Sequence, residues 1–264
     1  MTTTFELTTS AGKPYNIVLP APKTDFSSKF VFSFAKSGST LLNDLLFTYC
    51  PQMGVPVVSI FDQAFSQGLT TAEVRAESSK VFNSSGFIFS GFRHFPNFDL
   101  DVADNKCILL VRDPRDMAVS MYYSVTKSHV IPEGNDSLRR NREEALQKAI
   151  DEFVLDKIQS YVGQFRTYKE KLQGKQVKVY RYEDVIYDKV TWLGDVLDYL
   201  EIDKSSALLK NVVKQFDVIP DTENESQHVR QVHPGNYKKK LSDPAIEKLT
   251  EKARDFLNHY NYSI

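Results

Sequence analysis

The sequence predicts an α/β fold, a three-layer α/β/α arrangement with a central, mainly parallel sheet. Short apolar segments alternate along the chain with longer segments of helical period, which is typical of strands joined by crossover helices. One short segment, residues 107–111, is apolar without interruption, as expected of a strand buried on both faces. The length of 264 residues, 41% of them hydrophobic, suits one large domain with a sizeable core.

The individual elements follow from this pattern. The expected strands are residues 29–34, 86–92, 106–112 and 176–182. The expected helices are residues 40–49, 115–126, 143–172 with a break near Gly163, 185–200, 205–216 and 244–260. Asp113 is expected to cap the second helix, with Pro114 in its first turn. Residues 51–85 indicate no clear element, and prolines in residues 1–28 predict an extended lead-in to a single domain over 1–264.

The overall charge excludes several classes of partner. With 33 basic and 34 acidic residues the net charge is −1, so no broad field attracts nucleic acid or an anionic membrane. Residues 1–10 lack the pattern of a signal peptide, and no segment approaches a membrane span in length. Cys50 and Cys107 make no disulfide framework, and Cys107 lies in an apolar strand. We expect a cytoplasmic protein whose anion sites are local.

The first such local site is the turn Lys36-Ser37-Gly38-Ser39-Thr40, between the first strand and the first helix. Gly38 allows a tight turn, and the helix start offers N–H donors at the positive end of its dipole. Lys36 adds a charge and the hydroxyl groups add donors, which suits a phosphate or a sulfate. An ordinary capped turn is the alternative. The turn is not a Walker A motif, because its lysine precedes the glycine.

A second candidate site follows the third strand. Arg112 ends this strand, at the edge where sheets of this class bind ligands, and its planar guanidinium can hold a phosphate through two hydrogen bonds. Ser120 lies two turns into the next helix, where it can reach a group along the helix flank. The alternative is an ion pair of Arg112 with Asp113 or Asp116.

Residues 35–40 and 112–120 together resemble the two phosphosulfate-binding motifs of sulfotransferases, in the same order and at a similar separation. These enzymes move a sulfuryl group from 3′-phosphoadenosine 5′-phosphosulfate (PAPS) to a hydroxyl or amine and release 3′-phosphoadenosine 5′-phosphate (PAP). The resemblance implies a P-loop-like fold and no metal. It also implies that the first loop holds the 5′-phosphosulfate, while Arg112 and Ser120 hold the 3′-phosphate.

Two later segments extend the resemblance. Tyr182 lies in Tyr180-Arg181-Tyr182-Glu183-Asp184, which is similar to the Tyr-Glu-Asp segment whose tyrosine contacts the adenine; a core tyrosine is the alternative. Arg230 and Gly235 match the carboxy-terminal loop that closes over the donor, and this implies that Arg230 reaches the 3′-phosphate.

The sequence also departs from the family pattern. In the carboxy-terminal loop, Gln231 and Val232 replace Lys and Gly, and residues 236–237 replace Asp-Trp. Leu41 stands where many members have a tryptophan that stacks on adenine. Adenine stacking therefore rests on Tyr182 and an unidentified apolar partner.

The candidate base is His94, which follows the second strand and resembles the catalytic histidine of the family. Its reference pKa of about 6.5 suits a general base, and a structural histidine is the alternative. Lys36 is implied to polarise the bridging oxygen. Where the family often has a further lysine, two residues before the histidine, this chain has Phe92. Strand alternation predicts that the adjacent Arg93 points to the other face.

The function expected from these segments is in-line sulfuryl transfer to a small-molecule acceptor, since no basic stripe exists for a polyanion. A P-loop kinase or NTPase is one alternative, and the missing Walker A motif argues against it. A non-catalytic nucleotide-binding module is the other. Damage to Lys36 or His94 would be its expected signature, and both residues are present.

Overall fold

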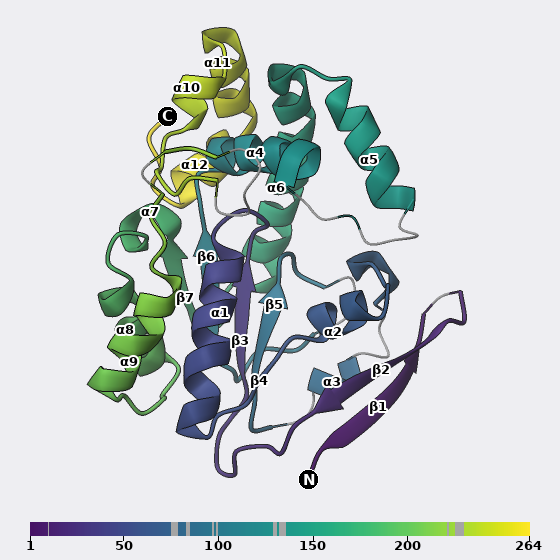
Figure 1. Ribbon diagram of the computed structural model, residues 1–264, viewed down its shortest axis with the longest axis vertical. Coiled ribbons are helices and arrows are strands. Elements are labelled where there is room, and N and C mark those ends of the chain that lie inside the picture. Colours follow the sequence, from purple (N-terminus) through teal and green to yellow (C-terminus); the bar gives the residue numbers. More distant parts are fainter. Residues whose placement is uncertain are drawn as a thin grey trace.

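A computed structural model describes residues 1–9, 11–74, 79–82, 85–96, 98, 100–128, 131, 136–220, 222–224 and 230–264. Its centre is a parallel sheet with the strand order β4-β5-β3-β6-β7 (Figure 1). The strands are β3 (Lys29–Ser33), β4 (Val57–Val58), β5 (Ile88–Phe92), β6 (Cys107–Val111) and β7 (Val177–Arg181). Each predicted strand is confirmed, and β4 is added from the segment that the sequence left unassigned.

Helices cover both faces of this sheet. One face packs against α1 (Ser39–Tyr49), α8 (Lys189–Tyr199) and α9 (Ser206–Phe216). The other packs against α2 (Ile60–Ser66), α3 (Ser79–Phe82), α4 (Pro114–Tyr123), α6 (Ile150–Lys171), α11 (Asp243–Lys252) and α12 (Arg254–His259). Along β3, Val31 joins the first cluster while Phe30 and Phe32 join the second, because successive side chains point to opposite faces. The predicted three-layer α/β class is confirmed.

The remaining helices are short or peripheral: α5 (Asp136–Leu146), α7 (Tyr182–Val185) and α10 (Tyr237–Lys240). Single turns of other helix types occupy Cys50–Met53, Thr71–Glu73 and Ser124–Ser128. Asp113 caps α4 as predicted, since its side chain accepts a hydrogen bond from the N–H of Arg115 at 2.9 Å. Pro114 lies in the first turn, also as predicted.

The predicted break near Gly163 is wrong. Helix α6 continues through Gly163. The interruption lies instead between α5 and α6, at residues 147–149, the last of which, Ala149, has an extended backbone. A glycine costs about 1 kcal/mol in a helix. Burial of the apolar side chains on the same helix, such as Ile158 and Phe165, outweighs that cost. The predicted helix 244–260 is divided instead, at Ala253.

The amino-terminal lead-in is a hairpin. Strands β1 (Thr3–Thr8) and β2 (Pro14–Leu19) pair antiparallel, at the lower right of Figure 1. Their inward side chains, including Tyr15 and Ile17, join the apolar cluster on the α2 face of the sheet. From α2, the side-chain amide of Gln63 pairs with the backbone of Val18 in β2, at 2.8 and 3.1 Å. The outer edge of β2 is therefore covered, which limits pairing of that strand with other chains.

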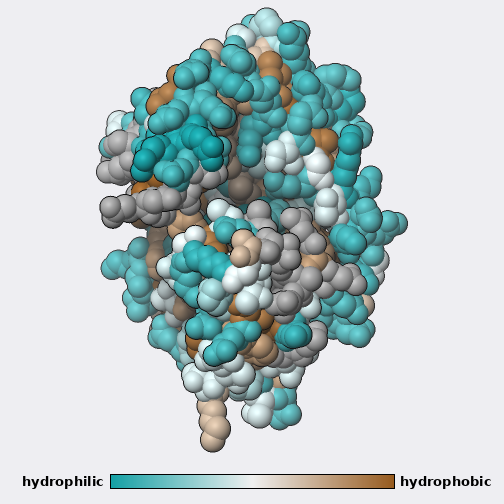
Figure 2. Space-filling model, turned by 90° about the vertical axis from the view of Figure 1, so that its right-hand side faces the viewer, coloured by the Kyte–Doolittle hydropathy of each residue, from teal (hydrophilic) through white to brown (hydrophobic). Residues whose placement is uncertain are grey.

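The surface is mainly hydrophilic on the face shown in Figure 2, where hydrophobic residues form small, scattered patches. Both cysteines are buried and unpaired, as the apolar context of Cys107 predicts. Within the described ranges, no helix combines the length and the apolar character that crossing a membrane requires.

The strand order fixes where a ligand can bind. From β3 the chain passes through α1 to β4 on one side, whereas from β6 it passes through α4 to α6 to β7 on the other side. The carboxyl ends of β3 and β6 therefore flank the topological switch point, where open α/β sheets bind their ligands. This edge is the upper end of the sheet in Figure 1.

Candidate active site

A cavity of about 390 Å³ lies at this edge. Seven of the residues predicted to bind the donor line it: Lys36, Gly38, Ser39, Thr40, Arg112, Ser120 and Tyr182. The other four predicted site residues, Ser37, His94, Arg230 and Gly235, do not line it. The structure thus brings together the two motifs that the sequence singled out, from opposite sides of the switch point.

The turn after β3 has the backbone of an anion-binding loop. Lys36 and Gly38 both have a positive φ, of 71° and 94°. At Gly38 a side chain is excluded, because a Cβ atom would lie 2.8 Å from Cδ2 of Tyr182. No side chain caps the start of α1, so its first N–H groups are left for a ligand. Ser37 is buried and donates its hydroxyl to the carbonyl of Phe34 at 2.8 Å, which makes its role in the loop structural.

Arg112 is buried but poorly satisfied. Its Nη1 donates to the carbonyl of Lys36 at 3.3 Å, and its Nη2 lies 3.7 Å from Asp116. Its buried Nε has no hydrogen-bond partner among the described residues. The guanidinium stacks 4.3 Å from the ring centre of Tyr182. Of the two ion pairs considered as alternatives, the one with Asp116 is present, whereas Asp113 pairs with Arg115 at 2.7 Å. Unused donors on a buried cation favour an anionic ligand.

The cavity concentrates positive charge. Burial, together with repulsion from Arg93, Arg112 and Arg230, lowers the pKa of Lys36 from its usual 10.5 to about 8. Among the described lining residues there are four cations, and Asp44 is the one carboxylate. An anion that entered would relieve this repulsion.

Arg93 also lines this cavity, and it points away from Phe92 and His94, which do not line it, as strand alternation predicts. A β-bulge in β5 determines that this face is the one toward the cavity. Phe30 pairs with Phe89, but Phe32 pairs with Phe92, so β5 contains one extra residue. A one-residue shift moves every later side chain to the other face of the sheet. The alternation of the sequence alone does not reveal this shift.

His94 follows the cavity-lining Arg93 in the chain but does not line the cavity itself; it is half-buried, with its ring centre 6.1 Å from that of Phe61. Burial and, second, the positive charge of Arg93 lower its pKa below the usual value. The imidazole is therefore neutral near pH 7, which is the form that a general base needs.

An apolar wall completes the cavity. Tyr182 packs with Ile186, Val232 and Leu41, and its hydroxyl donates to the carbonyl of Val232 at 2.9 Å. Phe216, at the end of α9, lines the same cavity. The sequence analysis missed Phe216, because nothing in an amphipathic helix marks its last apolar residue as ligand-facing.

The carboxy-terminal segment borders this site, since Gln231 and Val232 line the cavity. Arg230 is paired with Glu223, and its guanidinium lies 4.3 Å from the ring centre of Tyr123. When the side-chain amide of Asn236 is oriented with its oxygen toward Arg230, this oxygen accepts hydrogen bonds from the two Nη atoms of Arg230 at 2.8 and 3.1 Å. Asp116 accepts hydrogen bonds from the N–H of Gly235 at 2.7 Å and of Tyr237 at 2.9 Å. One buried carboxylate therefore joins the turn at residues 235–237 to the helix that follows Arg112.

The sulfotransferase domain model matches residues 27–259 of this sequence. The chain belongs to the sulfotransferase domain family. The resemblance noted in the sequence is thus confirmed, and the protein is a sulfotransferase. A search of the curated proteins finds no match.

Solved sulfotransferase structures share the fold. Mouse sulfotransferase SULT7A1, complexed with PAP, is 16% identical over 89% of this chain and 86% of its own, with a TM-score of 0.57. Retinol dehydratase in a complex with retinol and PAP is 14% identical over 96% and 90%, with a TM-score of 0.50. Sulfotransferase STF9 from Mycobacterium avium is 10% identical over 92% and 79%, with a TM-score of 0.51.

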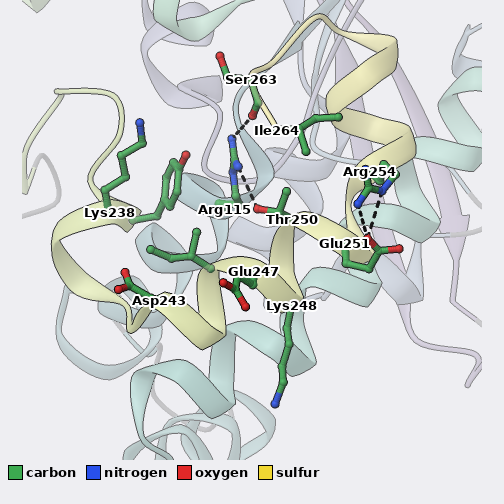
Figure 3. A pocket seen from close by; sticks show the side chains of 12 residues that line it. Arg115, Lys238, Asp243, Glu247, Lys248, Thr250, Glu251, Arg254, Ser263 and Ile264 are labelled. Carbon is green, nitrogen blue, oxygen red and sulfur yellow. Dashed lines mark hydrogen bonds and ion pairs between the residues drawn. The ribbon is translucent and has the colours of Figure 1, made fainter.

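A second, larger hollow of about 840 Å³ lies against α10, α11 and α12 (Figure 3). It also contains a buried arginine, Arg115, but here every guanidinium nitrogen has a hydrogen-bond partner. It pairs with Asp113 and donates to Thr250 at 3.0 Å and to the carbonyl of Ser263 at 2.7 Å. Arg254 pairs with Glu251 in the same hollow. In this sulfotransferase the buried arginine of the larger hollow is therefore neutralised by the protein itself.

Proposed function

We propose that this sulfotransferase binds PAPS in the cavity between β3 and β6 and transfers its sulfuryl group to a small-molecule hydroxyl or amine. The observation that carries the proposal is the buried, incompletely bonded Arg112 beside Lys36 at an uncapped helix start. Such a cluster is costly in an empty protein and favourable around an anion. PAP is present in the structures of SULT7A1 and retinol dehydratase, which supports the same donor here.

The strand order supports a place for each part of the donor. The turn at Lys36 and the start of α1, at the centre of the sheet, suit the 5′-phosphosulfate. Arg112 and Ser120, on the β6 side, suit the 3′-phosphate. The apolar wall of Tyr182, Leu41 and Phe216 suits the adenine and supplies the apolar partner that replaces the tryptophan.

Arg230, a predicted ligand of the 3′-phosphate, must move to reach the donor. In the structure it is paired with Glu223 outside the cavity lining, but it lies close enough to reduce the pKa of Lys36. We expect the 3′-phosphate to compete with Glu223 for Arg230. Asp116 keeps the turn at Gly235 next to Arg112 while this exchange occurs.

The chemistry is an in-line displacement. The acceptor oxygen or nitrogen forms a bond to sulfur as the bond from sulfur to the 5′-phosphate oxygen breaks, and the electron pair leaves with the phosphate. Lys36 stabilises the charge on this leaving oxygen, and neutral His94 takes the proton of the acceptor. No step needs a metal. In the part of the chain that the structure covers, no group of three or more His, Cys, Asp or Glu residues could hold one.

The acceptor is a small molecule in this proposal. Retinol dehydratase, with which the chain shares its fold, contains retinol together with PAP.

A turnover assay tests the proposal. PAP release from PAPS is measured with a panel of phenols, alcohols and amines, in the presence of a chelator, for the wild type and for Lys36→Met. We expect acceptor-dependent release that persists in the chelator and is lost in the variant. Release that requires added magnesium would contradict the mechanism. Donor binding without transfer to any acceptor would indicate that the protein is a non-catalytic nucleotide-binding module.

A further inference from the structure

Three neighbouring strands each contribute one cation to the donor cavity. Their order in the sheet is β5, β3, β6, and the cations that follow them are Arg93, Lys36 and Arg112. The sheet thus fixes a row of positive charges, with Lys36 in the middle. Arg112 and Lys36 have assigned ligands in the 3′-phosphate and the 5′-phosphate, whereas Arg93 has none.

The position of Arg93 is built into the fold rather than left to a flexible loop. The bulge that turns it toward the cavity includes Gly91, whose φ is +84°. A Cβ at Gly91 would lie 2.1 Å from Oγ of Ser59, the residue that caps α2. On either side of the bulge, Ser90 bonds Asn43 of α1 at 2.6 Å, and the ring of Phe92 packs 4.9 Å from that of Phe32.

Arg93 has no neutralising partner in the structure. It is exposed, and no ion pair or hydrogen bond joins its side chain to any described residue. Its positive charge contributes to the lowered pKa of both Lys36 and His94. A surface arginine held for stability would normally face a carboxylate, so this placement favours a ligand that brings its own negative charge.

We propose that Arg93 is a catalytic residue that contacts the oxygens of the sulfuryl group, an inference that rests on the proposed function. Once the phosphates are placed on Lys36 and Arg112, the sulfuryl group is the remaining anionic part of the donor. The β5 side is also where His94 meets the acceptor. As the sulfur passes from the phosphate oxygen to the acceptor, charge spreads over its three equatorial oxygens. The guanidinium of Arg93 can donate to two of them.

The test compares two nucleotides that differ by the sulfuryl group. Binding of PAPS and of PAP is measured by calorimetry, without acceptor, for the wild type, Arg93→Gln and Arg93→Lys. For Arg93→Gln we expect PAPS to bind about 10-fold more weakly and PAP to change less than about 2-fold. Arg93→Lys keeps the charge and is expected to fall in between. Arg166→Gln, an exposed arginine on α6 outside the cavity lining, is the matched control.

Three results have distinct meanings. Equal losses for PAPS and PAP in Arg93→Gln would overturn the proposal, because Arg93 would then serve a phosphate. No loss for either nucleotide would also overturn it, because Arg93 would then be a solvated surface charge. A wild type that binds PAP no better than AMP would remove the proposed function itself, independently of Arg93.

Discussion

Two buried arginines, Arg112 and Arg115, line two different hollows and differ in how fully their guanidinium groups are hydrogen-bonded. Arg112 faces a cavity of about 390 Å³ with an unbonded Nε, a long contact to Asp116 and cationic neighbours. Arg115 faces a hollow of about 840 Å³ and is saturated by Asp113, Thr250 and the carbonyl of Ser263. The difference shows that capacity for a ligand lies in unsatisfied polar groups and not in the size of a hollow.

The two environments also divide stability from function. Arg115 ties the start of α4 to the last residues of the chain, with its guanidinium 4.4 Å from the ring centre of Tyr237. Arg112 and Lys36 instead repel each other across the site. Residues that raise the free energy of an empty protein are expected where a ligand later neutralises them.

The largest effect is expected at Lys36. Replacing it with methionine removes the cation at the leaving oxygen, and we expect turnover to fall about 10³-fold. The same change removes a repelled charge, so the free energy of unfolding should rise by about 1 kcal/mol near pH 7, where the lysine is still protonated. PAP release and thermal unfolding are the two measurements. Unchanged turnover, or a lower Tm, would contradict this account of the site.

The comparison of the arginines is tested by a pair of variants. Arg112→Ala should weaken PAP binding about 100-fold and leave Tm near that of the wild type. Arg115→Ala leaves Asp113 without its partner and should cost about 3 kcal/mol of stability, while the folded fraction binds PAP normally. Calorimetric binding and denaturant unfolding separate the two effects. If both variants lost both properties equally, the division between the hollows would not hold.

A pH titration sharpens the assignment of the loop lysine. The pKa of Lys36 in the empty protein is about 8, below its ordinary value, so its charge disappears as the pH rises through this range. We expect PAP affinity to fall about 3- to 10-fold between pH 7.5 and 9.5. Lys36→Arg, which stays protonated, should show a flatter profile. An identical slope in the two proteins would assign the titration to another group.

The smallest effect concerns the third arginine of the site. Glu223→Gln removes the partner that holds Arg230 outside the cavity, and it also removes a negative charge near the 3′-phosphate. Both changes act in the same direction, so PAP should bind about 3-fold more tightly, a modest gain because the ion pair is partly exposed. AMP, which lacks the 3′-phosphate, should bind as before. Weaker PAP binding in this variant would show that Glu223 positions Arg230 instead of competing for it.

Much of the site could be predicted because it depends on local rules. The ends of β3 and β6, the glycine turn at Gly38 and the cap at Asp113 follow from strand length and turn chemistry. The bulge before Arg93 could not be predicted, since alternation does not reveal an extra residue that Ser59 and Asn43 hold in place. The pairing of Arg230 was hidden for a similar reason, because it depends on long-range packing.

The most direct test of the central claim is calorimetric titration of the wild type with PAP, AMP and ATP, without added metal. If the unneutralised charge around Arg112 binds a 3′-phosphate, PAP should bind about 100-fold more tightly than AMP. ATP, which has no 3′-phosphate, should bind with an affinity close to that of AMP. Equal affinities for PAP and AMP would contradict the claim, because the poorly bonded arginine would then have no 3′-phosphate to recognise.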